Sequence, residues 1–519
     1  MLLPILLLST AFSQDPGPAP EAAPEAAVEA SAPVEAQVQG PVFPGETWER
    51  ATPAEAGLNE AALDALLDYL FASNGDEVNR LGQRTNAFVL VKGGKIVVER
   101  YGRGTTADTP LLTWSVSKSF TNAIVGAAVQ RGDLDIGLPA AHYLSALDHG
   151  KHADILVKHL LTMSSGLAWN ETYEASPFTS TALAMLYGSG HADMAAYVAR
   201  KGLDATPGQR WRYSSGDTNL LVATLRAALA ERGQTEQGWA DWPWQSLFDP
   251  IGLKHATWER DAAGNFVGSF YLYAPAVELA RWAWLYRHDG VWGDQRLLPE
   301  GWVSMSTAVN AAYYSTPVNL EHYEDNPGAQ LYANRGDPAR GLPKPWPDLP
   351  DDAFGALGHW GKSIYVVPSW DMVVVRMGDD RTYACRYQGQ EGCEPDASKA
   401  FSSPRYQEML AAVMGSAGDG VAWSAPPRPD APFQKGNPAA SDLLKFRPAP
   451  SAYAAKETCS CRWVEGRDDA YCQAWAAQSA VPVKARAVDE DARTVSITAL
   501  GVTSTARWVS AREGCALEG

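Results

Sequence analysis

The sequence lacks two features that would point to a membrane or to a nucleic acid. No apolar run after the N-terminus reaches the roughly 20 residues that a helix needs to cross a bilayer. The chain has no excess of Lys and Arg either, because 60 acidic residues outnumber 43 basic ones and give a net charge of −17. Phosphate binding requires clustered basic side chains, so nucleic acid is not an expected partner and no transmembrane segment is expected.

Motifs for metal binding are missing as well. The sequence contains no His-Glu-x-x-His. Four histidines do cluster along the chain, but we expect them to pack or to face solvent: His142, His149, His152 and His159. The sequence therefore predicts no metal and no cofactor.

Cysteine is absent before Cys385 and then occurs six times, at Cys385, Cys393, Cys459, Cys461, Cys472 and Cys515. An even number is typical of disulfides in an oxidising compartment. Cys385 and Cys393 bracket a short polar loop and are predicted to pair, whereas the other four allow three pairings that remain open. A zinc site is the alternative, but Cys459-Ser-Cys461 is too tight for the usual ligand spacing and no His follows Leu444.

The N-terminal segment lacks basic residues. Residues 1–13 combine a short apolar run with the small residues Ala11 and Ser13, and we interpret them as the signal peptide of a periplasmic or secreted protein. The usual basic n-region is missing, so either the start codon is misplaced or the signal is atypical. Residues 14–45 are rich in Pro, Ala and Glu, which cannot build a core, and they are predicted to form a flexible tether.

The rest of the chain has what a large globular protein needs, since 46% of the residues are apolar and 19 are Trp. Residues 59–72 have helical periodicity, and residues 86–101 form two apolar runs around Gly93-Gly94, which is typical of a hairpin. Mostly helical residues follow, before two strands at 358–367 and 372–377 and a helix near 403–414. We therefore predict an α+β fold in which both hairpins pair into one mostly antiparallel sheet, with the helical insert on one side.

The composition also divides the chain into domains. We predict one domain over residues 46–424, followed by a Pro-rich linker over residues 425–452. Residues 453–519 contain four cysteines and an alternating run over 483–508, which favours a small, disulfide-linked, β-rich module. This module is expected to be structural or to dock cell wall or a protein.

One short motif carries chemistry. Ser115-Val-Ser-Lys118 is the single Ser-x-x-Lys of the chain, at the start of an apolar helix that Gly132 ends. Residues three apart share a helical face, so the Lys118 ammonium is expected beside the Ser115 hydroxyl. A lysine in a dry core loses its charge easily and can then accept a proton from serine. The alternative is an N-cap serine followed by a surface lysine.

Two further motifs follow in the chain. Tyr213-Ser-Ser215 comes after Pro207-Gly208, and His359-Trp360-Gly361 stands on a predicted strand. With Ser115-x-x-Lys118, and in this order, they resemble the serine β-lactamase/penicillin-binding-protein superfamily over residues 50–415. The closer likeness is to its class C-like branch of esterases, DD-peptidases and 6-aminohexanoate-dimer hydrolases. No Gly-x-Ser-x-Gly occurs, so the α/β-hydrolase route to a serine esterase is unsupported.

The resemblance implies a mechanism. Ser115 would be the nucleophile, and Lys118 with Tyr213 would move its proton, with Tyr213 as the base if Lys118 keeps the phenol acidic. Backbone N–H groups of Ser115 and Lys362 would form the oxyanion hole. An acyl-enzyme would form on Ser115, and water would release it.

The departures from the family pattern bear on the substrate. Ser215 stands where many members place Asn, and His359 stands where members that bind β-lactams use Lys. Serine has a shorter reach and histidine is mostly neutral near pH 7, so both changes favour carboxylic esters or small amides over β-lactams. Lys362 is a second source of positive charge near this position.

The substrate-binding residues implied by the resemblance are His359, Trp360, Gly361 and Ser215. Nearby aromatic residues are candidates for the pocket wall, with packing in the core as the alternative: Trp169, Tyr173, Tyr271 and Tyr273. We assign Trp169 and Tyr173 to substrate binding.

We therefore predict a serine hydrolase that acts on a small-molecule ester or amide. The first alternative is a β-lactamase or a penicillin-binding DD-peptidase. The second is a non-catalytic scaffold of the same fold that binds wall peptides or a partner protein, although Ser115, Lys118 and Tyr213 are all present.

Overall fold

The computed structural model describes residues 41–72, 83–171, 173, 177–314, 326–336, 344–380, 403–416, 446–477 and 483–518. Four predicted features lie outside these residues. They are the signal peptide, the tether up to residue 40, the Cys385–Cys393 pair and linker residues 425–445.

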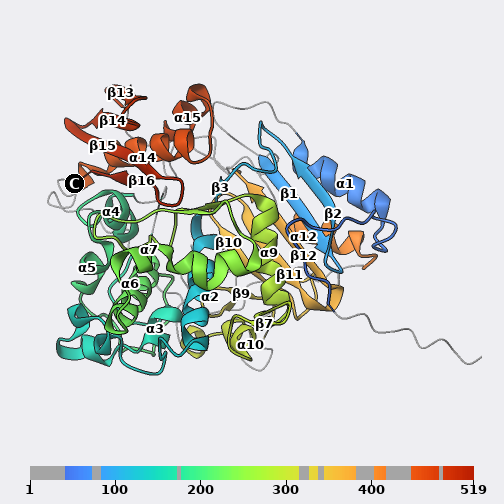
Figure 1. The fold of residues 1–519 in the computed structure, drawn as a ribbon, viewed down its shortest axis with the longest axis horizontal. Helices are drawn as coiled ribbons and strands as arrows, with labels where there is room; N and C mark the ends of the chain where they lie inside the picture. The colour runs from blue at the N-terminus through green and yellow to red at the C-terminus, as the bar shows by residue number, and fades with distance from the viewer. Residues whose placement is uncertain are drawn as a thin grey trace, which may run out of the picture. The chain divides into compact units, whose positions relative to one another are not determined.

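An antiparallel sheet with the strand order β2-β1-β12-β11-β10-β9-β8 forms the framework of the described chain (Figure 1). Its strands are β1 (Thr85–Lys92), β2 (Lys95–Tyr101), β8 (Asn326–Pro327), β9 (Tyr332–Ala333), β10 (Phe354–Gly358), β11 (Lys362–Val367) and β12 (Met372–Gly378). β1 pairs with β12, with Leu90 opposite Val374. The predicted union of the early and late hairpins in one antiparallel sheet is therefore confirmed.

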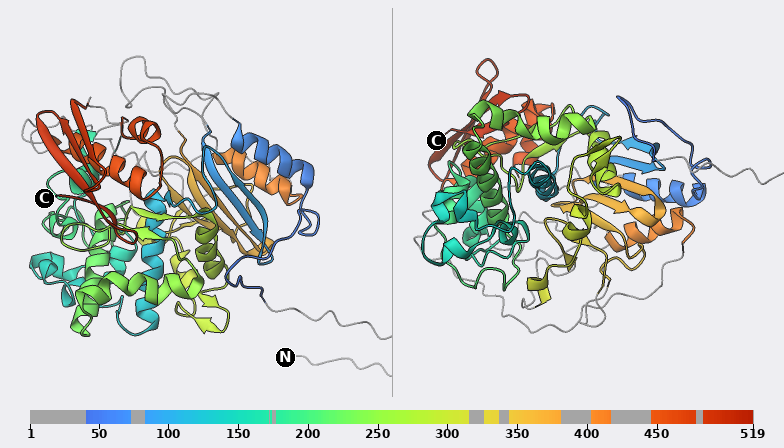
Figure 2. Two further views of the ribbon diagram at one scale, coloured as in Figure 1. Left: turned by 45° about the horizontal axis from the view of Figure 1, so that its top comes forward. Right: turned by 60° about the horizontal axis from the view of Figure 1, so that its bottom comes forward.

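Both faces of the sheet are buried, which explains why β1 and β12 are apolar almost without alternation. One face, with Phe88, Leu90 and Val374, packs against α1 (Glu60–Phe71) and α12 (Ser403–Val413), which lie side by side in Figure 2. The other face packs against α9 (Ala276–Arg287). The sheet is thus the middle layer between helices.

The helical half of the domain is built around α2 (Ser117–Gln130). Most of this helix is buried, as its small and apolar residues predict. The same half contains α3 (Val157–Leu161), α4 (Thr181–Tyr187), α5 (Met194–Ala199), α6 (Ser215–Glu231), α7 (Glu236–Pro243), α8 (Asp249–Ile251), α10 (Trp302–Ser306) and α11 (Ala311–Tyr314). Short strands complete this half: β3 (Leu111–Leu112), β4 (Thr257–Trp258), β5 (Leu272–Ala274), β6 (Val291–Trp292) and β7 (Gln295–Arg296).

The C-terminal segment, defined here as residues 446–518, is a helical pair on a small sheet. It contains α14 (Ala449–Trp463), α15 (Asp469–Ala476), β13 (Ala485–Asp489), β14 (Thr494–Ala499), β15 (Val502–Ser510) and β16 (Gly514–Leu517). The sheet was predicted, but the two helices were not, and α14 begins inside the predicted linker. Disulfides join Cys459 to Cys515 and Cys461 to Cys472, which selects one of the three open pairings.

No helix in the ranges given above combines the length and the apolar character that crossing a membrane requires.

Candidate active site

Ser115 lies in a single 3₁₀ turn, Trp114–Val116, that leads directly into α2. The Lys118 Nζ is 3.0 Å from the Ser115 Oγ and donates a second hydrogen bond to the Ser269 carbonyl oxygen at 3.1 Å. The residue before Ser115, Trp114, has a φ of +48°, a conformation that bulky side chains rarely adopt. The turn therefore holds the serine hydroxyl against the lysine amine in a strained backbone segment.

Lys118 is buried, with 2% of its surface exposed. Its Nζ lies 4.4 Å from the ring centre of Phe270 and 4.8 Å from that of Tyr213. Burial among these rings lowers the pKa of Lys118 to about 8, and the negative charge of Glu171 opposes this effect. With a pKa of about 8, roughly a tenth of Lys118 is neutral at pH 7 and able to accept a proton, and this fraction grows as the pH rises.

Tyr213 lies two residues before α6, whose N-cap is Ser214. Its hydroxyl interacts with the hydroxyls of Ser115 and Tyr332. Burial raises the pKa of Tyr213, and the charge of Glu171 raises it further. Burial and the negative charge of Glu171 thus act against an acidic phenol, which is the condition under which Tyr213 is predicted to be the base.

Glu171 is a buried carboxylate that the sequence analysis missed. It accepts hydrogen bonds from Trp169 Nε1 at 2.7 Å, from the Ser215 N–H at 2.7 Å, from the Ser215 Oγ at 2.6 Å and from the Tyr173 hydroxyl. Its charge acts on Lys118 and on Tyr213. One sequence signal was available, since Glu171 stands between Trp169 and Tyr173, two aromatic residues that are predicted to bind substrate.

These bonds involve three residues that are predicted to bind substrate. Ser215 is fully buried, and both of its donors point to Glu171. Trp169 and Tyr173 donate to the same carboxylate. The hydrogen-bond donors of Ser215, Trp169 and Tyr173 therefore stabilise the Glu171 carboxylate. A buried carboxylate is costly unless donors surround it.

His359, Trp360 and Gly361 form the turn between β10 and β11, so the predicted single strand over 358–367 is wrong. Trp360 and Gly361 have φ values of +58° and +77°, which end β10 and reverse the chain. Arg376 and Asp380 hold this turn in place. Arg376 Nη1 donates to the Gly361 carbonyl oxygen at 2.8 Å, and the Asp380 backbone N–H donates to the Trp360 carbonyl oxygen at 3.0 Å.

Arg376 and Asp380 are themselves paired by two hydrogen bonds, of 2.6 and 2.8 Å, in the interior of the protein. Such a two-pronged arrangement fixes orientation as well as distance. We call Arg376 and Asp380 the turn clamp. It determines where the backbone of Lys362, the residue after the turn, lies.

The end of β10 and the turn also contact the two residues before Ser115. A Cβ atom on Gly358 would lie 2.5 Å from the Thr113 carbonyl oxygen, so only glycine allows this contact. The ring of His359 packs against Trp114 and Tyr173, with ring centres 6.3 and 5.5 Å apart. The Lys362 Nζ donates to the Gly378 carbonyl oxygen at 2.5 Å.

A pocket opens beside the serine. Ser115, Lys118 and Tyr213 line it, and most of its remaining wall is apolar or aromatic, with Met163, Trp211, Leu331, Tyr332 and Leu357. The structure therefore brings the predicted catalytic residues together at one pocket, and none of the described residues that line it is acidic. The arrangement is suited to hold an uncharged group next to an activated hydroxyl.

Known proteins resemble this chain in sequence. Residues 76–383 match the family described as Beta-lactamase. A 6-aminohexanoate-dimer hydrolase of Paenarthrobacter ureafaciens is 26% identical over 271 residues, which are 51% of this chain and 67% of that protein.

A solved structure shares the fold. A beta-lactamase-like protein from Bacteroides dorei DSM 17855 superposes with a TM-score of 0.52 at 17% identity, over 69% of this chain and 100% of that one. A structure assigned to the 6-aminohexanoate-dimer hydrolases, from Bacillus anthracis, gives a TM-score of 0.47 at 19% identity, over 60% of this chain and 76% of that one.

Proposed function

The chain belongs to the beta-lactamase family, and on this premise we propose that it is a serine hydrolase that cleaves carboxylic esters or small amides through an acyl-enzyme on Ser115. The observation that carries the proposal is the 3.0 Å contact between the Ser115 Oγ and a buried lysine whose pKa is lowered to about 8. A neutral amine at this distance is a general base in hydrogen-bond reach of its proton.

The first half of the reaction uses Ser115, Lys118, Tyr213 and the backbone of Lys362. The Ser115 Oγ attacks the substrate carbonyl carbon while its proton passes to the Lys118 Nζ. The resulting oxyanion accepts hydrogen bonds from the backbone N–H groups of Ser115 and Lys362. Lys118 then gives the proton, through the Tyr213 hydroxyl, to the leaving alcohol or amine as the bond to the carbonyl carbon breaks.

The second half reverses these roles. Water attacks the acyl carbon and its proton passes to Lys118, so that a carboxylic acid leaves and the Ser115 hydroxyl is restored. Glu171 sets the balance between the two protonation states of Lys118, because its negative charge favours the ammonium form.

The pocket supports an uncharged ester or amide as substrate. Its wall is mainly apolar, and the ammonium of Lys362 is hydrogen bonded to a backbone carbonyl oxygen. A relative named for hydrolysis of an amide dimer favours the same class of reaction. The second candidate is β-lactam hydrolysis, which the family membership favours.

We also propose that the protein is exported. The sulfur pairs Cys459–Cys515 and Cys461–Cys472 lie at bonding distance, and disulfides of this kind persist in oxidising compartments.

The test is hydrolysis of p-nitrophenyl acetate and butyrate, with nitrocefin in parallel, by the wild-type chain and by Ser115→Ala and Lys118→Ala. We expect ester turnover that falls to the background rate in Ser115→Ala, and an acyl adduct on intact wild-type protein by mass spectrometry. Nitrocefin turnover without ester turnover would favour the second candidate. Equal rates for wild type and Ser115→Ala would overturn the proposal.

A further inference from the structure

The C-terminal segment lies beyond residues 76–383, which match the family, yet it contacts both stretches that hold the catalytic pair. One contact is made by Trp475 of α15 on the turn that carries Ser115. In the other contact, Glu457 of α14 accepts a hydrogen bond from Tyr271. Tyr271 lies two residues after Ser269, whose carbonyl oxygen accepts a hydrogen bond from Lys118.

Trp475 packs between two residues of the site. Its ring is stacked on that of Trp114, with centres 6.3 Å apart and planes 21° apart. It also meets Trp360 edge-on at 5.2 Å. Trp475 is 6% exposed, so it fills the space beside both rings. Trp114 precedes Ser115, and Trp360 belongs to the turn before Lys362.

Glu457 is hydrogen bonded to the stretch after Ser269. It is 1% exposed and accepts hydrogen bonds from Tyr187 at 3.0 Å, from Tyr271 at 3.1 Å and from Trp475 Nε1 at 3.1 Å. Tyr271 follows Phe270, whose ring lies 4.4 Å from the Lys118 Nζ.

The residues held in this way are strained. Trp114, Tyr271 and Trp360 have φ values of +48°, +61° and +58°, and they are the three aromatic residues with positive φ in the described part of the chain. Strained backbone persists only where the surrounding structure fixes it. Trp475 or Glu457 contacts each of the three.

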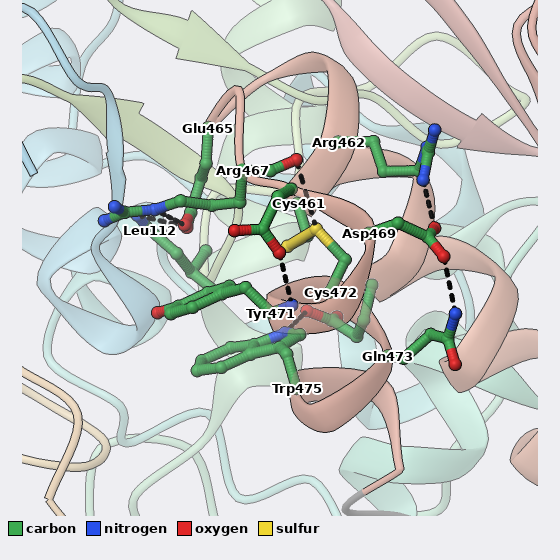
Figure 3. The surroundings of a disulfide bond; sticks show 12 residues. Leu112, Cys461, Arg462, Glu465, Arg467, Asp469, Tyr471, Cys472, Gln473 and Trp475 are labelled. Atoms are coloured by element: carbon green, nitrogen blue, oxygen red, sulfur yellow. Dashed lines mark hydrogen bonds and ion pairs between the residues drawn. A yellow bond between two sulfur atoms is a disulfide. The ribbon is translucent and has the colours of Figure 1, made fainter. Parts of the chain in front are cut away.

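A disulfide holds the two contacts together. Cys461 of α14 is bonded to Cys472 of α15, and Trp475 lies one helical turn after Cys472 (Figure 3). Glu457 lies one turn before Cys461 on α14. Since the bridge fixes one helix against the other, it sets the position of Trp475 relative to Glu457.

We infer that the C-terminal segment positions the active site. Trp475 and Glu457 hold three strained residues in place, Trp114, Tyr271 and Trp360. These residues in turn place Ser115, Lys118 and the turn 359–361 before Lys362. Trp475 and Glu457 are positioning residues, because they act through Trp114, Trp360 and Tyr271. The inference rests on the proposed function of Ser115.

The test compares Trp475→Ala and Trp475→Phe with a matched control, Trp508→Ala. Trp508 belongs to the same segment but packs against Arg493 and the small sheet. For each full-length variant, a fluorophosphonate probe and intact-mass spectrometry measure the rate of covalent labelling at Ser115 and the fraction of molecules labelled. The kcat for p-nitrophenyl butyrate is then expressed per labelled site, so that loss of folded protein does not count as loss of positioning.

We expect Trp475→Ala to lower the labelling rate and the kcat per site by roughly ten-fold or more, since small misplacements of a reacting group cost this much. Trp475→Phe should recover most of the loss, and Trp508→Ala should stay within about two-fold of wild type. If Trp475→Ala does not fold, Cys461→Ser/Cys472→Ser decides in its place: a lowered kcat per labelled site supports the inference, and a wild-type value overturns it.

Rates for Trp475→Ala equal to those of wild type would overturn the inference and leave the proposed function intact. Absence of labelling at Ser115 in the wild-type chain would instead overturn the proposed function, and the inference with it.

Discussion

At the scale of single residues, activity depends on the protonation of Lys118. Burial lowers its pKa to about 8, and only the neutral amine accepts the proton of Ser115. We therefore expect kcat/KM for p-nitrophenyl butyrate to rise with pH and to level off above an apparent pKa of about 8. The measurement is a pH profile from about pH 6 to pH 9 with the Ser115→Ala rate subtracted. A profile that is flat over this range would contradict the assignment of the base.

Glu171→Gln tests the electrostatic side of the same assignment. The Glu171 charge raises the pKa of Lys118, so its removal should lower that pKa and move the acid limb of the profile to lower pH. The maximum rate is expected to fall, because an amide cannot accept all the hydrogen bonds that the carboxylate accepts. Asp133→Asn on the protein surface is the control, and its profile should match that of wild type. An unmoved limb in Glu171→Gln would count against Lys118 as the titrating group.

Ser115 and Lys118 could be predicted from the sequence and Glu171 could not, because only the first two share a local sequence motif. Ser115 and Lys118 are three residues apart, so a short motif contains their geometry. The side chains and backbone that donate hydrogen bonds to Glu171 come from two separate stretches, residues 169–173 and the start of α6. Its burial depends on how these stretches fold together, which single-sequence patterns do not encode. Ser215 was marked, but its hydrogen-bond partner was not.

At the scale of secondary-structure elements, the turn clamp should control the rate without forming part of the pocket. Replacing the clamp as a pair, with Arg376→Gln/Asp380→Asn, avoids a buried unpaired charge, which is costly. We expect kcat to fall by roughly 10- to 100-fold with a smaller change in KM, because the Lys362 N–H no longer points at the developing oxyanion. Steady-state kinetics with p-nitrophenyl butyrate and a thermal melt measure the two effects.

Arg281→Lys is the control for the turn clamp. Arg281 is also a buried arginine that donates to backbone carbonyl oxygens, at Ile251, Gly45 and Glu46, but it lies on α9. It should lower the melting temperature and leave kcat nearly unchanged. If the clamp variant and Arg281→Lys had the same kcat, the clamp would have a structural role alone.

The same turn shows what limits prediction at this scale. Of the predicted strand over 358–367, the part from Lys362 to Val367 has the predicted element type, because β-branched residues in an apolar run favour a buried strand. The break inside it depends on the left-handed conformation of Trp360, which buried contacts impose. Gly361 was the available signal of a turn, but a glycine inside an apolar run is as readily a bulge.

At the scale of the whole molecule, the C-terminal segment departs most from its predicted description. The alternating run over 483–508 gave the strands, because period-two alternation is a local pattern. The helices α14 and α15 were missed, since the small polar and cysteine residues of 449–463 lack the periodicity of an amphipathic helix. α14 is buried over most of its length instead. Lys456 of α14 forms an ion pair with Glu259 of the helical half. Local sequence patterns do not predict such a long-range contact.

The two disulfides of this segment allow stability and activity to be separated in one protein. Cys459 and Cys515 are 56 residues apart, whereas Cys461 and Cys472 are 11 apart. Chain entropy in the unfolded state makes the longer loop worth about 4 kcal/mol and the shorter one about 3 kcal/mol. Cys459→Ser/Cys515→Ser should therefore lower the free energy of unfolding more than Cys461→Ser/Cys472→Ser, as measured by urea denaturation.

The order should reverse for activity. The shorter bridge fixes α15, which carries Trp475, whereas the longer one joins α14 to β16. We expect Cys461→Ser/Cys472→Ser to have the lower kcat per labelled Ser115, despite being the more stable of the two variants. If kcat instead followed stability, the segment would act on the site only through the stability of the whole fold. A reversed order requires a specific contact, because global unfolding alone lowers activity in the order of stability.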